Sequence, residues 1–548
     1  MTGPAAQVAE PEDVPQTAGG VGRAAMLIGG LTVLARVVGL GRQIVFAHTV
    51  GNACLGTAYA TANQLPNIIY DIVLGGALTS IMVPVLARPA GRSGTDPAAA
   101  REVSQISSAL LTWTIVILVP VSAALAIGAG PLVSLLIPVG RSGCPHADLV
   151  AVSSRMLVVF APQILLYGLA VVLYGILQAH RRFTAPALAP VLSSLVVIGA
   201  YLAYVPLHAG HPTQLAGLSR AAELTLSAGT TAGVAALVVT ALVPAWRLRL
   251  RLRLRPALRF PDGVARRARA LATVGIAALV TQDASVLMVT WLANGHGEQG
   301  AVVLYGYGWQ LFTSAYAVLA IPIAISAFPV LAASRGSAFD DTAASSARVA
   351  LLMSCLGAAL LAGAAVPASR VFAGPAQVTQ LALAFAAFAP GLIGYGLAAC
   401  LFRVLLADGR NRMAATAMSA GWLLVIAVDV AAVQLVSPRW VVPVLALGNT
   451  VGLTVSGVAL LAAVRRARGV AALHGMVRAG AAGLTAALAG AGAAAALSAT
   501  VPAAGVIPNG LLAVAASACA CAVFGAIAYA LDGGDLRAVV ARVRRARR

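Results

Sequence analysis

Long apolar runs alternate with short polar segments along nearly the whole chain. A helix needs about 20 consecutive apolar residues to cross the hydrocarbon core of a bilayer. Runs of that kind predict fourteen spans, near residues 24–48, 56–86, 105–137, 148–179, 184–206, 223–246, 268–293, 301–333, 346–372, 377–407, 413–436, 440–464, 476–499 and 505–531. With 60% hydrophobic and 10% charged residues, the composition agrees. The predicted fold class is an all-α integral membrane protein.

The arginines predict which ends of the helices face the cytoplasm, because loops on that side retain positive charge. With the amino terminus inside, the inner segments hold most arginines, nine of them between Arg247 and Arg269. The outer loops hold only four, which are Arg141, Arg220, Arg370 and Arg439. We therefore expect a multi-pass protein with both termini in the cytoplasm.

The stretch WRLRLRLRLRPALRF (Trp246 to Phe260) has the alternation of a half-buried strand. We interpret it as a cytoplasmic loop between the sixth and seventh spans, with its arginines on the anionic lipids of the inner leaflet. The net charge of +20 follows from this topology. Without an aromatic-interleaved platform or recognition helix beside the arginines, we expect no nucleic-acid partner.

Two segments six spans apart are similar. FAPQILLYGLAVVLY (Phe160 to Tyr174) matches FAPGLIGYGLAACLF (Phe388 to Phe402), and SIMVPVLAR (Ser80 to Arg88) matches ISAFPVLAAS (Ile325 to Ser334). Copies separated by an even number of spans cross the membrane in the same direction, which predicts parallel repeats. The expected organisation is a disordered tail (1–22), a first lobe of six spans (23–247), a basic loop (248–267), a second lobe of six spans (268–465), two further helices (476–531) and a basic tail (532–548).

Six cysteines occur without CxxC or Cys/His spacing, so the sequence predicts no metal and no cofactor. Cys54 and Cys144 both fall in predicted outer loops. They either pair in an oxidising compartment or are two small apolar residues, and the sequence leaves both readings open.

Three stretches resemble the MurJ/MviN lipid II flippases of the MOP exporter superfamily. They are ARVVGLGRQIVFAHTVG (Ala35 to Gly51), TAYATANQLPNIIYDIVLGGALTSIMVPVLA (Thr57 to Ala87) and LFRVLLADGRNR (Leu401 to Arg412). The resemblance implies a bacterial plasma-membrane transporter, not an enzyme, that moves a lipid-linked peptidoglycan precursor from the inner to the outer leaflet by alternating access of two lobes. It places the lipid tail outside the lobes, along the last two spans, and leaves cell-wall synthesis proteins open as partners.

Two arginines, Arg36 and Arg42, lie inside the first apolar run, where each is costly unless it faces a polar cavity or a partner. Guanidinium groups bind phosphate oxygens bidentately. The resemblance makes both arginines cavity residues for a lipid-linked diphosphate. The alternative is that Arg42 reaches toward an interface while Arg36 pairs with a buried carbonyl or acid.

The second span carries Asn63, Asn67 and Asp71 on one helical face. With Gln310 in the eighth span, these residues are predicted to line the substrate cavity. The alternative for the second span is hydrogen bonding that packs the bundle.

Asp283 and Asp429 are acids inside predicted spans, and each is either a structural counter-ion or a functional charge. Asp283 could pair with Arg36 or hold a cation or proton. No GxxxxGK[ST] motif is present, so an ion gradient, the membrane potential or substrate flux would have to drive transport. Arg403 beside Asp408 completes the set of candidates.

The chain departs from the pattern of the resembled family at Thr57, Tyr70, Gly75 and Gln310, where the family usually carries charged residues. A cavity with fewer charges also fits export of another polyprenyl-diphosphate-linked oligosaccharide, or an inactive scaffold. Drug export fits poorly because Arg36 and Arg42 are cationic. A glycosyltransferase would need paired outer carboxylates, whereas the sequence offers only scattered Asp148, Glu223 and Glu298.

Overall fold

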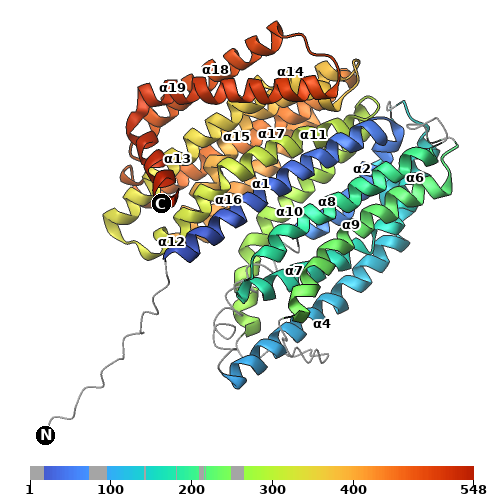
Figure 1. Ribbon diagram of the computed structural model, residues 1–548, viewed down its shortest axis with the longest axis horizontal. Helices are drawn as coiled ribbons and strands as arrows, with labels where there is room; N and C mark the ends of the chain where they lie inside the picture. The colour runs from blue at the N-terminus through green and yellow to red at the C-terminus, as the bar shows by residue number, and fades with distance from the viewer. Residues whose placement is uncertain are drawn as a thin grey trace.

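The computed structural model describes residues 18–72, 96–140, 143–180, 182–208, 215, 217–247 and 264–547. In these ranges the regular structure is entirely helical (Figure 1). The amino-terminal half consists of α1 (Ala18–Thr49), α2 (Cys54–Ile72), α4 (Pro97–Ile127), α5 (Ala129–Leu136), α6 (His146–Phe160), α7 (Gln163–Ala179), α8 (Thr184–Tyr204), η2 (Val205–Leu207) and α9 (Arg220–Arg247).

The carboxy-terminal half and the appended segment are also built from helices. This half consists of α10 (Val264–His296), α11 (Ala301–Leu319), α12 (Ile321–Ala333), α13 (Gly336–Gly363), α14 (Ala365–Phe372), α15 (Val378–Ala407), α16 (Asn411–Val433), η3 (Pro438–Trp440) and α17 (Val441–Arg468). The appended pair, α18 (Met476–Thr500) and α19 (Val506–Arg547), is preceded by η4 (Ala471–Leu473). The predicted basic tail is therefore helical up to Arg547, after a kink at Asp532.

The predicted all-α membrane fold is confirmed. Within the described ranges, twelve helical segments are long and apolar enough to cross a membrane. The two remaining predicted spans correspond to α2 and α10, which carry the polar residues singled out from the sequence. Residues 73–86 of the predicted second span and the loop at 248–263 lie outside the described residues, as does the SIMVPVLAR segment.

The internal repeat appears as matching contacts in the two halves. In the amino-terminal half, Tyr59 of α2 lies edge-on to Phe160 at 5.6 Å between ring centroids, and its hydroxyl is 2.8 Å from Thr230 Oγ1 of α9. In the carboxy-terminal half, Tyr305 of α11 lies 5.4 Å from Phe388, and its hydroxyl accepts a 2.5 Å hydrogen bond from Asn449 of α17. The three residues of each set come from equivalent spans, so the repeat extends to the packing.

The repeated proline has a different effect in each half. Pro162 lies between α6 and α7 and interrupts the fourth span, whereas Pro390 lies inside the continuous helix α15. Proline removes a backbone donor and frees a carbonyl about one turn earlier. Near that point, Thr450 of α17 donates to the Ala387 carbonyl at 2.6 Å, which helps α15 remain unbroken.

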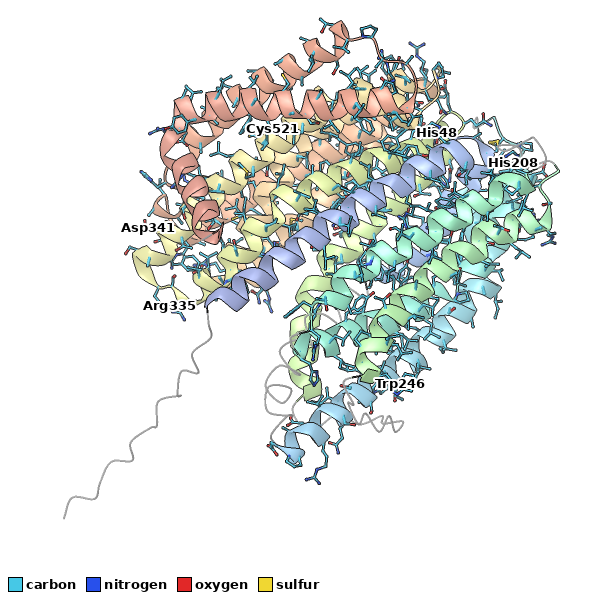
Figure 2. All side chains as sticks on the ribbon, in the orientation of Figure 1. His48, His208, Trp246, Arg335, Asp341 and Cys521 are labelled. Carbon is cyan, nitrogen blue, oxygen red and sulfur yellow. A yellow bond between two sulfur atoms is a disulfide. The ribbon has the colours of Figure 1, made fainter. Side chains whose placement is uncertain are left out.

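Figure 2 shows that the labelled residues separate into two ends of the molecule. Trp246, Arg335 and Asp341, all predicted to be cytoplasmic, lie at one end, which we call the inner end. His48 and His208 lie at the opposite, outer end. Helix α19 finishes at the inner end (Figure 1). The residues that the arginine bias assigns to the cytoplasm thus lie at one end of the molecule, and which side of the membrane that end faces stays a prediction.

The appended pair packs on the carboxy-terminal half through small side chains. Both α18 and α19 contact α13, and α19 also contacts α14. Gly483 of α18 lies against Cys355 of α13, and a cluster of Ala364, Ala494, Ala516 and Ala520 fills the junction. Small residues let membrane helices approach closely, so dispersion contacts can hold them together where lipid provides no hydrophobic driving force.

Candidate functional site

Arg36 and Arg42 lie on α1 without a counter-ion among the residues that the structure describes. Arg36 is exposed and Arg42 is half-buried. Neither forms a hydrogen bond or ion pair with any residue in the described ranges, and the predicted alternative of an Arg36–Asp283 pair is therefore absent there. Helix α1 packs mainly on α8, and it also contacts α11 and α14 of the other half. Two unpaired guanidinium groups thus lie on the helix that adjoins both halves.

The polar face of α2 faces a tyrosine of the same half. Asn67 accepts a 3.2 Å hydrogen bond from the hydroxyl of Tyr167, whose ring lies 4.3 Å from that of Tyr70. Arg42 lies within electrostatic reach of Tyr167. Asn63 has a buried side-chain oxygen with no partner in the structure. The structure therefore joins Asn67 to Tyr167 by a hydrogen bond, without a contact from Arg42 among the described residues, and leaves Asn63 with an unused acceptor.

Two acids from different halves approach this group. Asp71, at the end of the described part of α2, is exposed and lies within electrostatic reach of Asp283 on α10. Asp283 is 3% exposed, and neither of its carboxylate oxygens has a hydrogen-bond partner. A buried carboxylate without a partner is unfavourable unless it binds a proton or a cation. Asp283 therefore fits a site for either one.

Asp429 of α16 is a second enclosed acid, far from the first in the sequence. It is 0% exposed, and both of its oxygens lack a partner. A Cβ atom on Gly448 of α17 would lie 1.7 Å from Asp429 Oδ1, so only glycine leaves room for the carboxylate there. Tyr305 lies within electrostatic reach. This site combines one acid with the Tyr305–Asn449 hydrogen bond.

Gln310 does not join the arginines through any contact among the described residues. Its side-chain amide donates to Ser314 on the same helix at 3.2 Å. The neighbouring residues of α11 belong to an aromatic cluster comprising Trp309, Phe312, Phe388, Tyr395 and Trp422. Gln310 thus lies beside aromatic side chains and not beside the charged residues named above.

The family-type positions that differ in this chain have local partners. Thr57 donates to the Ala53 carbonyl at 3.0 Å, and the ring of Tyr70 lies against that of Tyr167 at a tilt of 35°. Gly75 lies outside the described residues. The three described positions therefore carry uncharged side chains that pack within their own half.

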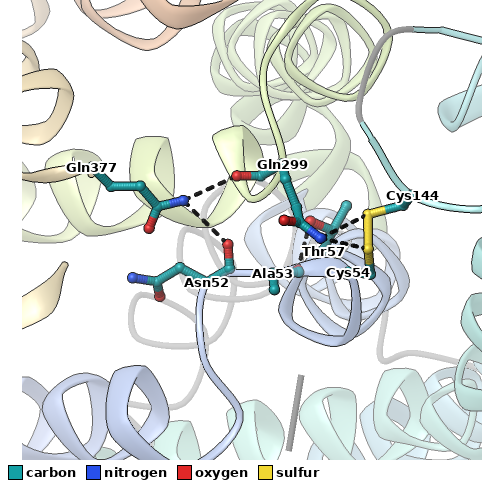
Figure 3. Close-up of a disulfide and its surroundings, with 7 residues drawn as sticks. All are labelled: Asn52, Ala53, Cys54, Thr57, Cys144, Gln299 and Gln377. Atoms are coloured by element: carbon teal, nitrogen blue, oxygen red, sulfur yellow. Dashed lines mark hydrogen bonds between the residues drawn. A yellow bond between two sulfur atoms is a disulfide. The ribbon is translucent and has the colours of Figure 1, made fainter. Parts of the chain in front are cut away.

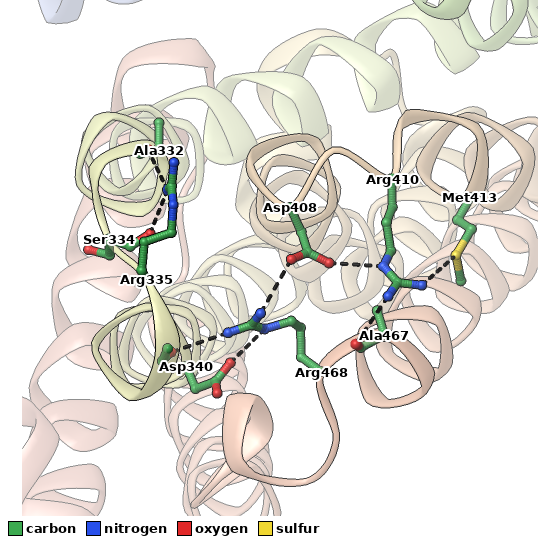
Figure 4. Close-up of polar contacts among 10 residues, drawn as sticks. Ala332, Ser334, Arg335, Asp340, Asp408, Arg410, Met413, Ala467 and Arg468 are labelled. Carbon is green, nitrogen blue, oxygen red and sulfur yellow. Dashed lines mark hydrogen bonds and ion pairs between the residues drawn. The ribbon is translucent and has the colours of Figure 1, made fainter.

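The inner end of the carboxy-terminal half holds a network of ion pairs (Figure 4). Arg468 of α17 contacts Asp340 at 2.9 Å and Asp408 at 3.5 Å, and Arg410 contacts Asp408 at 2.9 Å. Arg403 instead donates to the carbonyl of Ala399 on its own helix. The predicted proximity of Arg403 and Asp408 thus gives no ion pair, because Arg410 and Arg468 occupy the carboxylate.

The two halves are joined at the outer end by hydrogen bonds centred on Asn52. Its amide donates to the Phe372 carbonyl at 2.7 Å, and its side-chain oxygen accepts from the hydroxyl of Tyr307 at 2.7 Å. Close by, His48 Nε2 lies 2.9 Å from the Val371 carbonyl. All these partners belong to the carboxy-terminal half, so the turn between α1 and α2 closes the outer end.

A disulfide lies beside this closure (Figure 3). Cys54 is bonded to Cys144, which settles the choice between the two readings of these cysteines. Gln299 of the other half donates to Cys54 Sγ at 2.8 Å, and Gln377 donates to the Gln299 carbonyl at 3.0 Å. The disulfide therefore holds in place the part of the amino-terminal half that Gln299 of the other half contacts.

Gly300 allows the closest approach of the two halves. It has a left-handed conformation at φ +83°, and a Cβ atom there would lie 1.8 Å from the Asn52 carbonyl oxygen. Asn294, on α10, also crosses the interface and donates to Thr61 Oγ1 and to the Leu136 carbonyl, each at 3.0 Å. The outer end is thus closed by backbone contact and a few polar groups, together with a buried apolar cluster to which both halves contribute.

Sequence reasoning missed the residues of this closure, among them His48, Asn52 and Tyr307. Their partners are more than 250 positions away, so no local pattern pointed to them. It also placed Glu223 in an outer loop, whereas Glu223 is 3% exposed in the first turn of α9 and binds Arg155 bidentately. Within the described ranges no group of three or more His, Cys, Asp or Glu residues could hold a metal ion.

Comparisons with known proteins identify the family. The family model described as "Lipid II flippase MurJ" matches residues 46–514. The "Lipid II flippase MurJ" of Burkholderia cenocepacia is 28% identical over 34% of this chain and 34% of its own length. The "Probable lipid II flippase MurJ" of Rhizobium tropici is 25% identical over 58% of this chain and 56% of its own. The matches thus span about a third to just over half of these relatives.

Solved structures support the fold. The structure titled "Lipid II flippase MurJ, inward closed conformation" superposes with a TM-score of 0.69 at 15% identity, covering 92% of this chain and 99% of that one. An inward-facing multidrug resistance MATE transporter of the MOP superfamily gives 0.62 at 14% identity, covering 82% and 98%. Since the family match spans most of the sequence, the protein belongs to the lipid II flippase MurJ family, whose members are transporters and not enzymes.

Proposed function

We propose that the protein moves lipid II from the inner to the outer leaflet of the bacterial plasma membrane by alternating access. The observation that carries the proposal is the pair Arg36 and Arg42, which lie unpaired on α1 in the described part of the structure. A guanidinium inside a membrane protein is costly unless it meets an anion or water. The diphosphate of lipid II would supply that anion, with Asn63, Asn67 and Asp71 beside it and Gln310 on the opposite half.

The closure at the outer end supports alternation. The two halves contact each other there through hydrogen bonds, a close backbone approach and an apolar cluster that includes Val50 and Leu55 of one half and Val303 and Phe372 of the other. On the inner half of α1, Val33, Leu34 and Val37 are about half exposed. Contacts of this kind can break without unfolding either half. We therefore infer an inward-facing state that opens outward when the Asn52 contacts separate.

The proposed orientation has two sources of support. Disulfides persist in oxidising compartments, so Cys54–Cys144 belongs on the outer side of the plasma membrane. The residues predicted to be cytoplasmic lie at the opposite end. Both termini would then be cytoplasmic. Arg247 to Arg269 would reach anionic lipids of the inner leaflet, although most of that segment lies outside the described residues.

The energy for transport would come from an ion that binds to one of the enclosed acids. Asp283 lies close to the polar face of α2, and Asp429 lies deep in the carboxy-terminal half. Each lacks a hydrogen-bond partner, so a cation or proton would stabilise it. We infer that one of these acids binds the coupling ion.

The proposal is tested by complementation of a bacterial strain depleted of its lipid II flippase. The parent protein and Arg412→Ala, an exposed inner arginine, are expected to restore growth, whereas Arg36→Ala and Arg42→Ala are not. Membrane expression is measured for each variant. Growth with both cavity variants would contradict the proposal and favour a scaffold role.

A second cargo is favoured by one specific feature, the contact between the rings of Tyr70 and Tyr167, whose centroids lie 4.3 Å apart beside the polar face of α2. An aromatic face suits a sugar better than a second phosphate contact. Another polyprenyl-diphosphate-linked oligosaccharide is thus the alternative. A well-expressed parent that fails to restore growth, yet binds such a lipid in an Arg42-dependent way, would select this alternative.

A further inference from the structure

The appended helices form a pocket with the carboxy-terminal half at the outer end. Its volume is about 390 Å³. It lies where α14 and the start of α15 meet the turn between α18 and α19, which pack together in Figure 1. The lining includes Arg370, Val378 and Asn509, together with the small residues Ala373, Pro375 and Ala503. None of these residues takes part in the proposed transport cavity.

Positive charge dominates this pocket. Arg370 is exposed in the last turn of α14 and forms no hydrogen bond or ion pair with the described residues. Val378 is the first residue of α15, and Asn509 lies in the first turn of α19. Neither first turn contains an acid, and residues from both first turns line the pocket, so the positive ends of two helix dipoles lie beside it; Pro508 in the first turn of α19 has no N–H to donate. An anion is the favoured occupant.

A buried hydrogen-bond acceptor places a second requirement on the occupant of the pocket. Asn509 is 3% exposed, and its amide donates to the carbonyls of Ala503 at 3.2 Å and Gly505 at 2.8 Å. These two bonds fix which end of the amide is oxygen. The oxygen is buried and has no partner in the structure. A buried unpaired acceptor is costly, so the occupant is expected to bring an O–H or N–H group.

The surroundings indicate that the occupant is a lipid. Ile507, Leu511 and Val514 form an apolar stripe on α19 that starts beside the pocket, and each is at least 67% exposed. On a helix that crosses the membrane, such a stripe faces hydrocarbon. A headgroup in the pocket would therefore have its chains along α19.

We propose that this pocket binds a lipid phosphate of the outer leaflet that carries a neighbouring hydrogen-bond donor. Arg370 and the two helix starts hold the phosphate, and Asn509 accepts from the hydroxyl or amide. Phosphatidylglycerol has this chemistry, and so does lipid II after translocation. The second source rests on the proposed function, whereas the first does not.

The test uses the purified full-length protein in phosphatidylcholine nanodiscs, with lipid binding counted by native mass spectrometry. Phosphatidylglycerol, phosphatidylmethanol and lipid II are added separately. Phosphatidylmethanol has the same charge as phosphatidylglycerol but no hydroxyl donor. We expect the parent to bind at least one of the two donor-bearing lipids several-fold more tightly than phosphatidylmethanol, because the Asn509 oxygen is satisfied only by a donor.

Variants separate this site from general attraction to a cationic protein. Arg370→Gln is expected to weaken binding about tenfold, as loss of a charge-assisted contact does, and Arg370→Lys less. Arg439→Gln, another exposed outer arginine, is the matched control and is expected to leave binding unchanged. Equal losses in Arg370→Gln and Arg439→Gln, or no loss in either, would overturn the proposal.

The lipid whose binding depends on Arg370 shows whether the pocket takes a resident phospholipid or the translocated cargo. Arg370-dependent binding of phosphatidylglycerol alone assigns the site to a resident phospholipid, and binding of lipid II alone assigns it to the translocated cargo. Phosphatidylglycerol binding can succeed even if complementation by the parent fails. Arg36→Ala is expected to retain Arg370-dependent binding in either case, so failure of the transport proposal and failure of this proposal give different results.

Discussion

The outer closure and the polar region around α1 differ in how their polar groups are satisfied. At the outer end, His48 and Asn52 bond to carbonyls of the opposite half, and Gln377 donates to the Asn52 carbonyl at 3.5 Å. Around α1 and α10, Arg42 and Asp283 have no hydrogen bond or ion pair among the described residues. Polar groups that satisfy one another hold a conformation, whereas unsatisfied groups inside a membrane protein require a ligand. The comparison thus separates closing residues from binding residues.

The largest expected effect comes from an unsatisfied group. Arg42→Gln keeps a polar side chain but removes the charge, so it is expected to lower lipid II translocation in proteoliposomes about 10- to 100-fold, the loss of one charge-assisted phosphate contact. Thermal stability is expected to stay almost unchanged, because no partner is left behind. Arg412→Gln is the control. Loss of stability matching the loss of transport would show that Arg42 is structural.

The next effect concerns backbone contact at the closure. Gly300→Ala places a methyl group against the Asn52 carbonyl and requires a left-handed alanine, which costs about 1–2 kcal/mol before the clash. The equilibrium is therefore expected to shift toward the outward-open state by tenfold or more. Distances between spin labels on α1 and α14 would measure it. An unchanged distance distribution would mean that this contact does not govern closure.

Hydrogen bonds at the same place give a smaller shift. Asn52→Ala removes two side-chain bonds to the carboxy-terminal half, each worth about 0.5–1.5 kcal/mol, so the outward-open fraction is expected to rise several-fold to about 100-fold at most. Gln434→Ala is the matched control, since its bond to His296 stays within one half. If the control shifts the label distances equally, Asn52 is not the centre of the closure.

The smallest effect is a gain in stability. Asp429→Asn removes an enclosed charge that has no partner in the structure, so it is expected to raise stability in ion-free detergent by about 1 kcal/mol while abolishing any stabilisation by the coupling cation. Melting curves across a sodium series, at constant ionic strength, would show both changes. A cation-dependent melting temperature that survives in the variant would move the ion site elsewhere.

The fold could be predicted in outline because the bilayer imposes it. Backbone groups in hydrocarbon must pair internally, so the long apolar runs had to form helices, whereas the direction that the arginine bias gives them stays a prediction. The FAP motifs at Phe160 and Phe388 likewise located equivalent helices, because repeated packing needs the same residue shapes. The predicted site residues depended on a local rule, that charge is costly inside a span.

The sequence by itself therefore determined the membrane helices, their repeat and the positions of Arg36, Arg42, Asp283 and Asp429, because each follows from the chemistry of a short segment in lipid. Only the tertiary structure decided that these four charges have no hydrogen bond or ion pair among the described residues, that Cys54 meets Cys144, and that Asn52 joins the two halves. These contacts link residues 90 to more than 300 positions apart. Their formation depends on how whole helices pack, and packing geometry leaves no periodic trace in a single sequence.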